Sequence, residues 1–199
     1  GNRAAEPGPA SRGRGRGTVA RVRGTGRLVG MGSPRSRIVV ATGIALIALP
    51  LVALGLKVFS FGWMMVILMF GPVFVLVAGY ALQIVIAVQG FLVRRSLFEA
   101  APGRTRAIVA AWLTSIGVVL VGVFMPDGGD IGYGSTLQVW LGAYSGSEGV
   151  EAMHEATDGL TSVLTWIAGL AWVAGFLWLL AEWVAALVQR RRARRVAAQ

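Results

Sequence analysis

The stretch LTSVLTWIAGLAWVAGFLWLLAEWVAALVQ at residues 160–189, followed at once by RRRARR at 190–195, decides the fold of this chain. Its only ionisable side chain is Glu182. A helix needs about 20 apolar residues to cross the hydrocarbon core of a bilayer, so this run is long enough to span and to tilt. Arginines directly after such a run are typical of a helix that ends at the cytoplasmic face.

Three further apolar stretches precede it, at residues 38–56, 63–93 and 107–125. They are continuously apolar rather than alternating, which predicts helices and not the strands of a barrel. The second is longer than a bilayer requires, and we expect it to bend at Gly71-Pro72 because proline disrupts helical hydrogen bonding. With 55% hydrophobic and 14% charged residues, the chain predicts an all-α integral membrane protein with four transmembrane helices.

The charges predict how these helices are oriented. Lys57 is the only lysine among the 19 basic residues. With four spans, every arginine falls on the side that holds both termini, including those of 94–106 and 190–195. The other side holds Lys57 and six acids, namely Asp127, Asp130, Glu148, Glu151, Glu155 and Asp158. Because basic residues are retained in the cytoplasm, both termini are expected inside. An odd number of spans would place basic clusters on both sides.

The segments outside the spans differ in character. Residues 1–37 contain the Arg-Gly run at 12–17 and lack apolar periodicity, so we expect a disordered basic tail. Residues 1–30 are either an upstream extension of a misplaced start or a genuine tail, since Met31 and the residues after it resemble a natural beginning. Residues 126–159 are expected to form an acidic outer loop, in which 137–144 could rest on the membrane, cover the helix ends or contact a partner. Residues 190–199 are expected to form a basic cytoplasmic tail.

Small side chains predict where helices approach closely. They recur at four-residue spacing in the third stretch, at Ala107, Ala111 and Ser115, and in the fourth, as the pairs Ala171 with Gly175 and Ala181 with Ala185. We interpret these residues as packing positions.

Polar residues within the spans are candidates for transport, because their burial in lipid is costly. They are Glu182, Gln83 and Gln89, and Lys57 lies at the boundary of the first span. The structural alternative pairs Glu182 with an arginine of 94–106 or of the C-terminal run. In that alternative the glutamines hydrogen-bond to neighbouring helices or lie at the inner membrane interface.

Two groups of residues are candidate metal sites. Glu151, His154, Glu155 and Asp158 are spaced i, i+3, i+4 and i+7. If the fourth helix begins near Val150, they share one face of it and could bind a divalent metal. The structural alternative is that acids favour the positive N-terminus of a helix. A soft-metal path for copper would use Met64, Met65 and Met69, with apolar packing as the alternative.

The sequence excludes several kinds of chemistry. It has no cysteine and a single histidine, so it lacks disulfides, thiolate metal sites and a bis-histidine haem. No nucleotide-binding, hydrolase or zincin motif is present. We therefore expect no enzymatic activity and no cofactor. The Gly-, Ala-, Val- and Arg-rich composition suggests a bacterial origin, which makes the plasma membrane the expected location.

Two functions remain. The first is a non-enzymatic accessory or assembly subunit, acting through helix packing and the acidic outer loop on a membrane-protein partner or another copy of itself. The alternative is a small oligomeric transporter or channel that uses Glu182, Gln83 and Gln89. Beside a bilayer, the arginines are expected to contact anionic lipid headgroups rather than nucleic acid.

Overall fold

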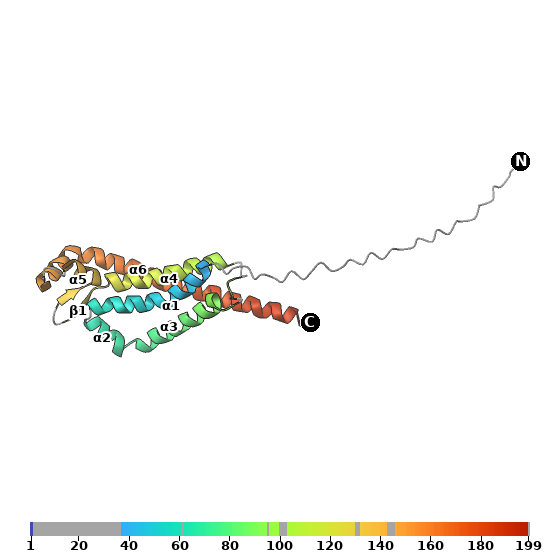
Figure 1. Ribbon diagram of the computed structural model, residues 1–199, viewed down its shortest axis with the longest axis horizontal. Helices are drawn as coiled ribbons and strands as arrows, with labels where there is room; N and C mark the ends of the chain where they lie inside the picture. The colour runs from blue at the N-terminus through green and yellow to red at the C-terminus, as the bar shows by residue number, and fades with distance from the viewer. Residues whose placement is uncertain are drawn as a thin grey trace. The chain divides into compact units, whose positions relative to one another are not determined.

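Four long apolar helices account for most of the computed structural model, which describes residues 1, 37–60, 62–94, 96–99, 103–129, 132–142 and 146–198. Helices α1 (Arg37–Lys57), α3 (Val73–Ala87), α4 (Arg104–Phe124) and α6 (Gly146–Val196) carry these segments (Figure 1). Within the described residues, four helical segments are long and apolar enough to cross a membrane, as predicted. The predicted disordered tail lies outside the described residues, apart from Gly1 and from Arg37, which begins α1.

The predicted bend of the second stretch is a full break. Helix α2 (Trp63–Phe70) ends at Gly71, and α3 begins after Pro72. A 3-10 turn, η1 (Val58–Ser60), joins α1 to the segment before α2. Proline has no N–H to continue the hydrogen bonding of α2, so the single helix expected over 63–93 is divided here.

A π-helical turn, η2 (Val88–Leu92), ends the second stretch, and the chain then folds back on it. The N–H of Leu97 donates to the carbonyl of Gln89 at 3.0 Å, and that of Phe98 to the carbonyl of Gly90 at 3.3 Å. A Cβ on Gly90 would lie 2.6 Å from the Phe98 ring, so a larger residue would push the returning segment away. The polar connection is thus held against the helix end.

The segment expected as an outer loop is largely ordered structure. Strands β1 (Asp127–Gly129) and β2 (Gly132–Gly134) pair antiparallel, and α5 (Thr136–Gly142) follows. Gly142 permits close contact between α5 and α6, because a Cβ there would meet the backbone of Val150 at 2.7 Å. Helix α5 begins over the ends of α1 and α4, where Thr136 Oγ1 donates to the carbonyls of Leu56 and Gly122. Residues 143 and 144 of the expected 137–144 segment lie outside the described residues.

Helix α6 is longer than the predicted span at both ends, with 51 residues and a length of about 75 Å. It starts at Gly146 rather than at residue 160, and it continues through the arginines that were expected to form a separate tail. Acids near its start and arginines near its end interact favourably with the helix dipole, so both stabilise the extended helix. Arginine also has a high helix propensity. Hydropathy alone marks the apolar centre of such a helix and misses its polar extensions.

Successive spans run antiparallel: Gly43 of α1 lies against Leu92 beyond the end of α3, and Gly117 of α4 lies against Trp172 of α6. Tyr80 Oη of α3 donates to the carbonyl of Ile47 in α1 at 2.8 Å, and Trp112 Nε1 of α4 donates to Thr42 Oγ1 of α1 at 3.1 Å. Helix α1 is therefore flanked by both α3 and α4. We call the end with Arg37, Arg94 and Arg190 the arginine end, and the opposite end of the bundle the acidic end.

The predicted small-residue packing is confirmed for α4 and only in part for α6. Ala107, Ala111 and Ser115 are buried, as is Gly175, where a Cβ would meet the backbone N of Thr114 at 2.8 Å. Ala181 and Ala185 are exposed. The buried residues of α6 include Thr161, Ala168, Gly175, Leu179 and Ala186. Their spacing follows a heptad rather than a four-residue repeat, as expected for helices that cross at a small angle.

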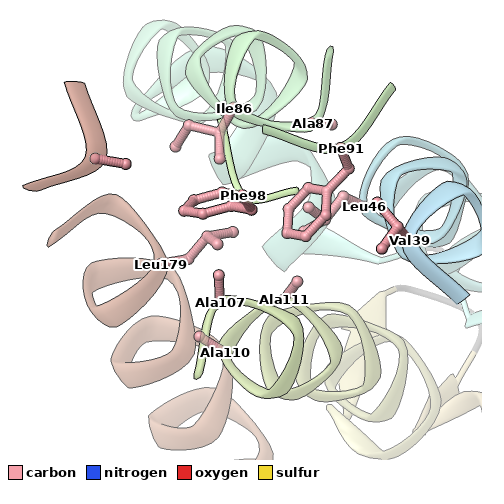
Figure 2. Close-up of a cluster of buried hydrophobic side chains, with 11 residues drawn as sticks. Val39, Leu46, Ile86, Ala87, Phe91, Phe98, Ala107, Ala110, Ala111 and Leu179 are labelled. Carbon is pink, nitrogen blue, oxygen red and sulfur yellow. The ribbon is translucent and has the colours of Figure 1, made fainter. Parts of the chain in front are cut away.

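The apolar core draws residues from the first half of α1 and the first turns of α4, so it lies toward the arginine end. Figure 2 shows its side chains. Phe91 and Phe98 are fully buried at its centre, with ring centroids 5.0 Å apart. Ala107, Ala110 and Ala111 of α4 face them, and the remaining walls come from α1, α3 and α6 through Val39, Leu46, Ile86, Ala87, Leu179 and Ala186. The small α4 face leaves room for the two rings, which explains why the returning segment packs here.

Candidate functional site

A buried lysine forms the centre of a polar cluster at the acidic end. Lys57 is only 8% exposed. Its Nζ donates to the carbonyl of Met125 at 2.6 Å and to Ser60 Oγ at 3.2 Å. Ser60 Oγ lies 3.0 Å from Thr136 Oγ1, which in turn lies 3.1 Å from the carbonyls of Leu56 and Gly122. These bonds connect the ends of α1 and α4 with the start of α5.

Asp127 supplies the negative charge of this cluster. It is 5% exposed and interacts electrostatically with Lys57. Its carboxylate accepts from the backbone N–H groups of Gly62 at 3.2 Å and Gly128 at 2.9 Å. A Cβ on Gly62 would lie 2.5 Å from the carbonyl oxygen of Gly128, so only glycine fits. The cluster thus ties the segment before α2 to the β1–β2 hairpin.

From the sequence, Lys57 is expected at the edge of a span, without an assigned partner. The signal available was a lone lysine on the acidic side, since a buried ammonium needs a carboxylate and further acceptors. The sequence spacing does not show which of the six acids pairs with Lys57, because Asp127 follows α4 and is distant from Lys57 along the chain. Asp127 is near Lys57 because the β1–β2 hairpin closely approaches Gly62.

Gln83 satisfies a carbonyl that proline has deprived of its donor. Pro50 lies within α1 and has no N–H, so the carbonyl of Leu46, four residues earlier, loses its usual helical partner. Gln83 Nε2 donates to that carbonyl at 2.8 Å, and the side chain is only 4% exposed. This confirms the predicted bond between a glutamine and a neighbouring helix.

Glu182 pairs with an arginine of the 94–106 segment, as the structural alternative predicted. Arg106 Nε lies 3.0 Å from Glu182 Oε1, and Trp178 Nε1 donates to the same oxygen at 3.4 Å. The glutamate side chain is 15% exposed and that of the arginine 64%. The pair therefore sits at the rim of the bundle and joins α4 to α6.

Gln89, the third transport candidate, lies in different surroundings from Gln83 and Glu182. It is exposed and lines an open hollow of about 140 Å³ at the arginine end. The other lining residues are Val93, Arg94, Leu97, Leu187 and Arg190. Neither Gln83 nor Glu182 lines this hollow. The three transport candidates thus have three different sets of neighbours.

The four metal candidates lie on the first turns of α6, where the helix carries them on one face. His154 Nε2 lies 3.8 Å from Asp158 Oδ1. Glu151, Glu155 and Asp158 are exposed. Among the described residues, no group of three His, Cys, Asp or Glu side chains is placed to hold a metal ion. The copper candidates Met64, Met65 and Met69 have side chains outside the described part of the structure.

Comparison with models of protein families, with curated proteins and with solved structures finds no match to this chain.

Proposed function

We propose that this chain is a four-span protein of a bacterial plasma membrane, with both termini in the cytoplasm, and that it acts as a non-enzymatic accessory or assembly subunit. Its helices would form a stable unit in the lipid, and its acidic end would contact a partner outside.

Helix length and charge placement support the membrane location. Helices α1 and α4 each have 21 residues, or about 30 Å, which matches the hydrocarbon thickness. Arg37 and Lys57 bound α1, and Arg104 begins α4. Large apolar side chains are exposed along all four spans, which water would not favour but lipid accommodates.

An aromatic pair supports the same placement at the acidic end. The rings of Phe59 and Trp140 meet edge to face with centroids 5.9 Å apart, and both side chains are exposed. Val58 and Leu141 beside them are exposed as well. Tryptophan with neighbouring apolar groups is typical of the boundary between lipid and water.

The observation that carries the accessory role is how the polar groups of the spans are used. Gln83 completes the hydrogen bonding of α1, and Glu182 joins α4 to α6. Both serve the packing of the bundle. The transporter alternative would need them to share a water-filled path with Gln89, and their separate neighbours favour the accessory role.

The absence of cysteine allows a direct test of orientation, since single cysteines can be introduced without background. In intact cells, a membrane-impermeant maleimide is expected to label Glu151→Cys. It is expected to label Ala197→Cys only after lysis. Labelling of the 197 position from outside would overturn the proposed orientation.

The accessory role is tested by purification in mild detergent and identification of the proteins that co-purify. A specific partner should be lost in Glu151→Gln/Glu155→Gln and retained in Glu99→Gln, which removes an exposed acid from the connection at the arginine end. A chain that purifies alone and, in vesicles, drives a solute flux abolished by Glu182→Gln would instead establish the transporter.

A further inference from the structure

Two arginines from distant parts of the sequence meet at one hollow at the arginine end. Arg94 follows η2, and Arg190 lies near the end of α6. Both line the hollow described above together with Gln89. The ion pairs found within the described residues are Arg106 with Glu182 and His154 with Asp158, so neither of these arginines pairs with a carboxylate there. Two arginines that line one hollow place positive charge there, and positive charge attracts an anion.

The rest of the hollow is apolar. Its apolar lining comes from Val93 and Leu97, which follow η2, and from Leu187 of α6. The fold-back after η2 places Leu97 beside Gln89, since the Leu97 N–H donates to the Gln89 carbonyl. On α6, Leu187 and Arg190 are three residues apart and therefore neighbours on one face. The hollow thus combines charged donors, an amide donor and apolar walls.

We propose that this hollow binds the phosphate headgroup of an anionic phospholipid. Guanidinium groups bind phosphate oxygens through paired hydrogen bonds, and the Gln89 amide offers a further donor. The apolar side chains suit the glycerol and the first methylenes of the acyl chains. Basic pockets between helices at the cytoplasmic boundary are suited to such headgroups. This inference rests on the proposed membrane orientation and adds to it one site of defined residues, distinct from diffuse attraction to the other arginines.

The test uses the full chain purified in a neutral detergent, with native mass spectrometry to count retained lipid. Phosphatidylglycerol supplies the anionic headgroup, and phosphatidylcholine with the same acyl chains is the zwitterionic comparison. Inorganic phosphate is added as a competitor to separate a lipid headgroup from a free anion. One phosphatidylglycerol per chain should be retained, with phosphatidylcholine bound weakly and inorganic phosphate unable to displace the lipid.

Variants with matched charge make the test specific. Arg190→Gln is compared with Arg192→Gln, which removes an equal charge from the same exposed helix end but does not line the hollow. Arg190→Gln and Arg94→Gln should each weaken phosphatidylglycerol binding about 10-fold, as expected for loss of a charge-assisted contact. Arg192→Gln should leave binding within about 2-fold, as expected of a residue without a shared partner.

Three results would overturn the proposal. Equal weakening by Arg190→Gln and Arg192→Gln would indicate diffuse charge attraction. Equal retention of phosphatidylcholine would indicate an acyl-chain contact without headgroup recognition. Displacement of phosphatidylglycerol by inorganic phosphate would assign the hollow to a free anion. Because binding is measured in detergent, a reversed orientation in the labelling experiment would refute the proposed function and leave this result intact.

Discussion

Replacing Gln83 with methionine should destabilise the bundle through a single carbonyl, that of Leu46. Methionine keeps the length and apolar volume of the side chain but donates no hydrogen bond. The Leu46 carbonyl would then lack both its helical donor, which Pro50 cannot provide, and the 2.8 Å bond from Gln83.

The magnitude follows from the burial of this group. An unsatisfied buried acceptor costs about 1–3 kcal/mol in water-soluble proteins. Hydrogen bonds between membrane helices average about 0.6 kcal/mol and reach about 1.7 kcal/mol. Because Gln83 is buried and its acceptor has no helical donor, we expect a loss near the upper membrane value, about 1–1.5 kcal/mol.

A double-mutant cycle isolates the cause. In Pro50→Ala, residue 50 regains an N–H that can donate to the Leu46 carbonyl, so Gln83→Met should cost much less in that background. The free energy of unfolding is measured by titrating dodecyl sulfate into mixed micelles and following helix content by circular dichroism. Gln189→Met, at an exposed position of α6, controls for the chemical change.

The outcome that refutes this reasoning is additivity. If Gln83→Met costs the same in both backgrounds within about 0.5 kcal/mol, the scatter of independent sites, then the missing helical donor does not explain the bond. The reasoning would also be refuted if Gln189→Met lowered the free energy of unfolding as much as Gln83→Met does.

Three further perturbations test other contacts by the same unfolding measurement. Lys57→Met should lower the free energy of unfolding by about 3 kcal/mol, because it leaves the buried Asp127 carboxylate without its cation. Adding Asp127→Asn should recover part of this loss, and a Lys57→Met variant of unchanged stability would contradict the buried cluster. Gly175→Ala should destabilise the bundle by about 1–3 kcal/mol through overpacking against α4. Gly169→Ala, where a Cβ meets nothing within 4 Å, should be neutral or stabilise by up to about 1 kcal/mol. Equal effects of the two variants would argue against close contact between α4 and α6. Glu182→Gln should cost less than about 1 kcal/mol, because its partner is largely exposed, and a larger loss would mean that the pair is more isolated from solvent than the structure has it.

Hydropathy predicted the four apolar helices well, because a long run without charge has few other stable conformations. The Gly71-Pro72 pair predicted the interruption of the second stretch, because proline disrupts helical hydrogen bonding at its own position. The ends of α6 were missed for the converse reason. Residues such as Glu148 and Arg194 are polar, so a search for apolar runs stops before them, although both favour helix at the positions they occupy.

The candidate residues divide in the same way. The pairing of Glu182 with the 94–106 segment was predictable, because topology places both at one end and their charges are opposite. The hollow at Gln89 was not, because it depends on the π turn and on the return of Leu97 to the helix end. Backbone hydrogen bonds between segments leave no periodic pattern in a sequence.

The sequence by itself determined that this chain is helical and apolar, with basic residues gathered on one side of four spans, because composition and charge order are properties of the chain. Only the tertiary structure decided which polar groups meet. Lys57 needed Asp127 from a distant hairpin, and the Leu46 carbonyl, deprived of its donor by Pro50, needed Gln83 from another helix. Such pairings depend on the rotation and crossing of helices, which the apolar runs alone do not specify.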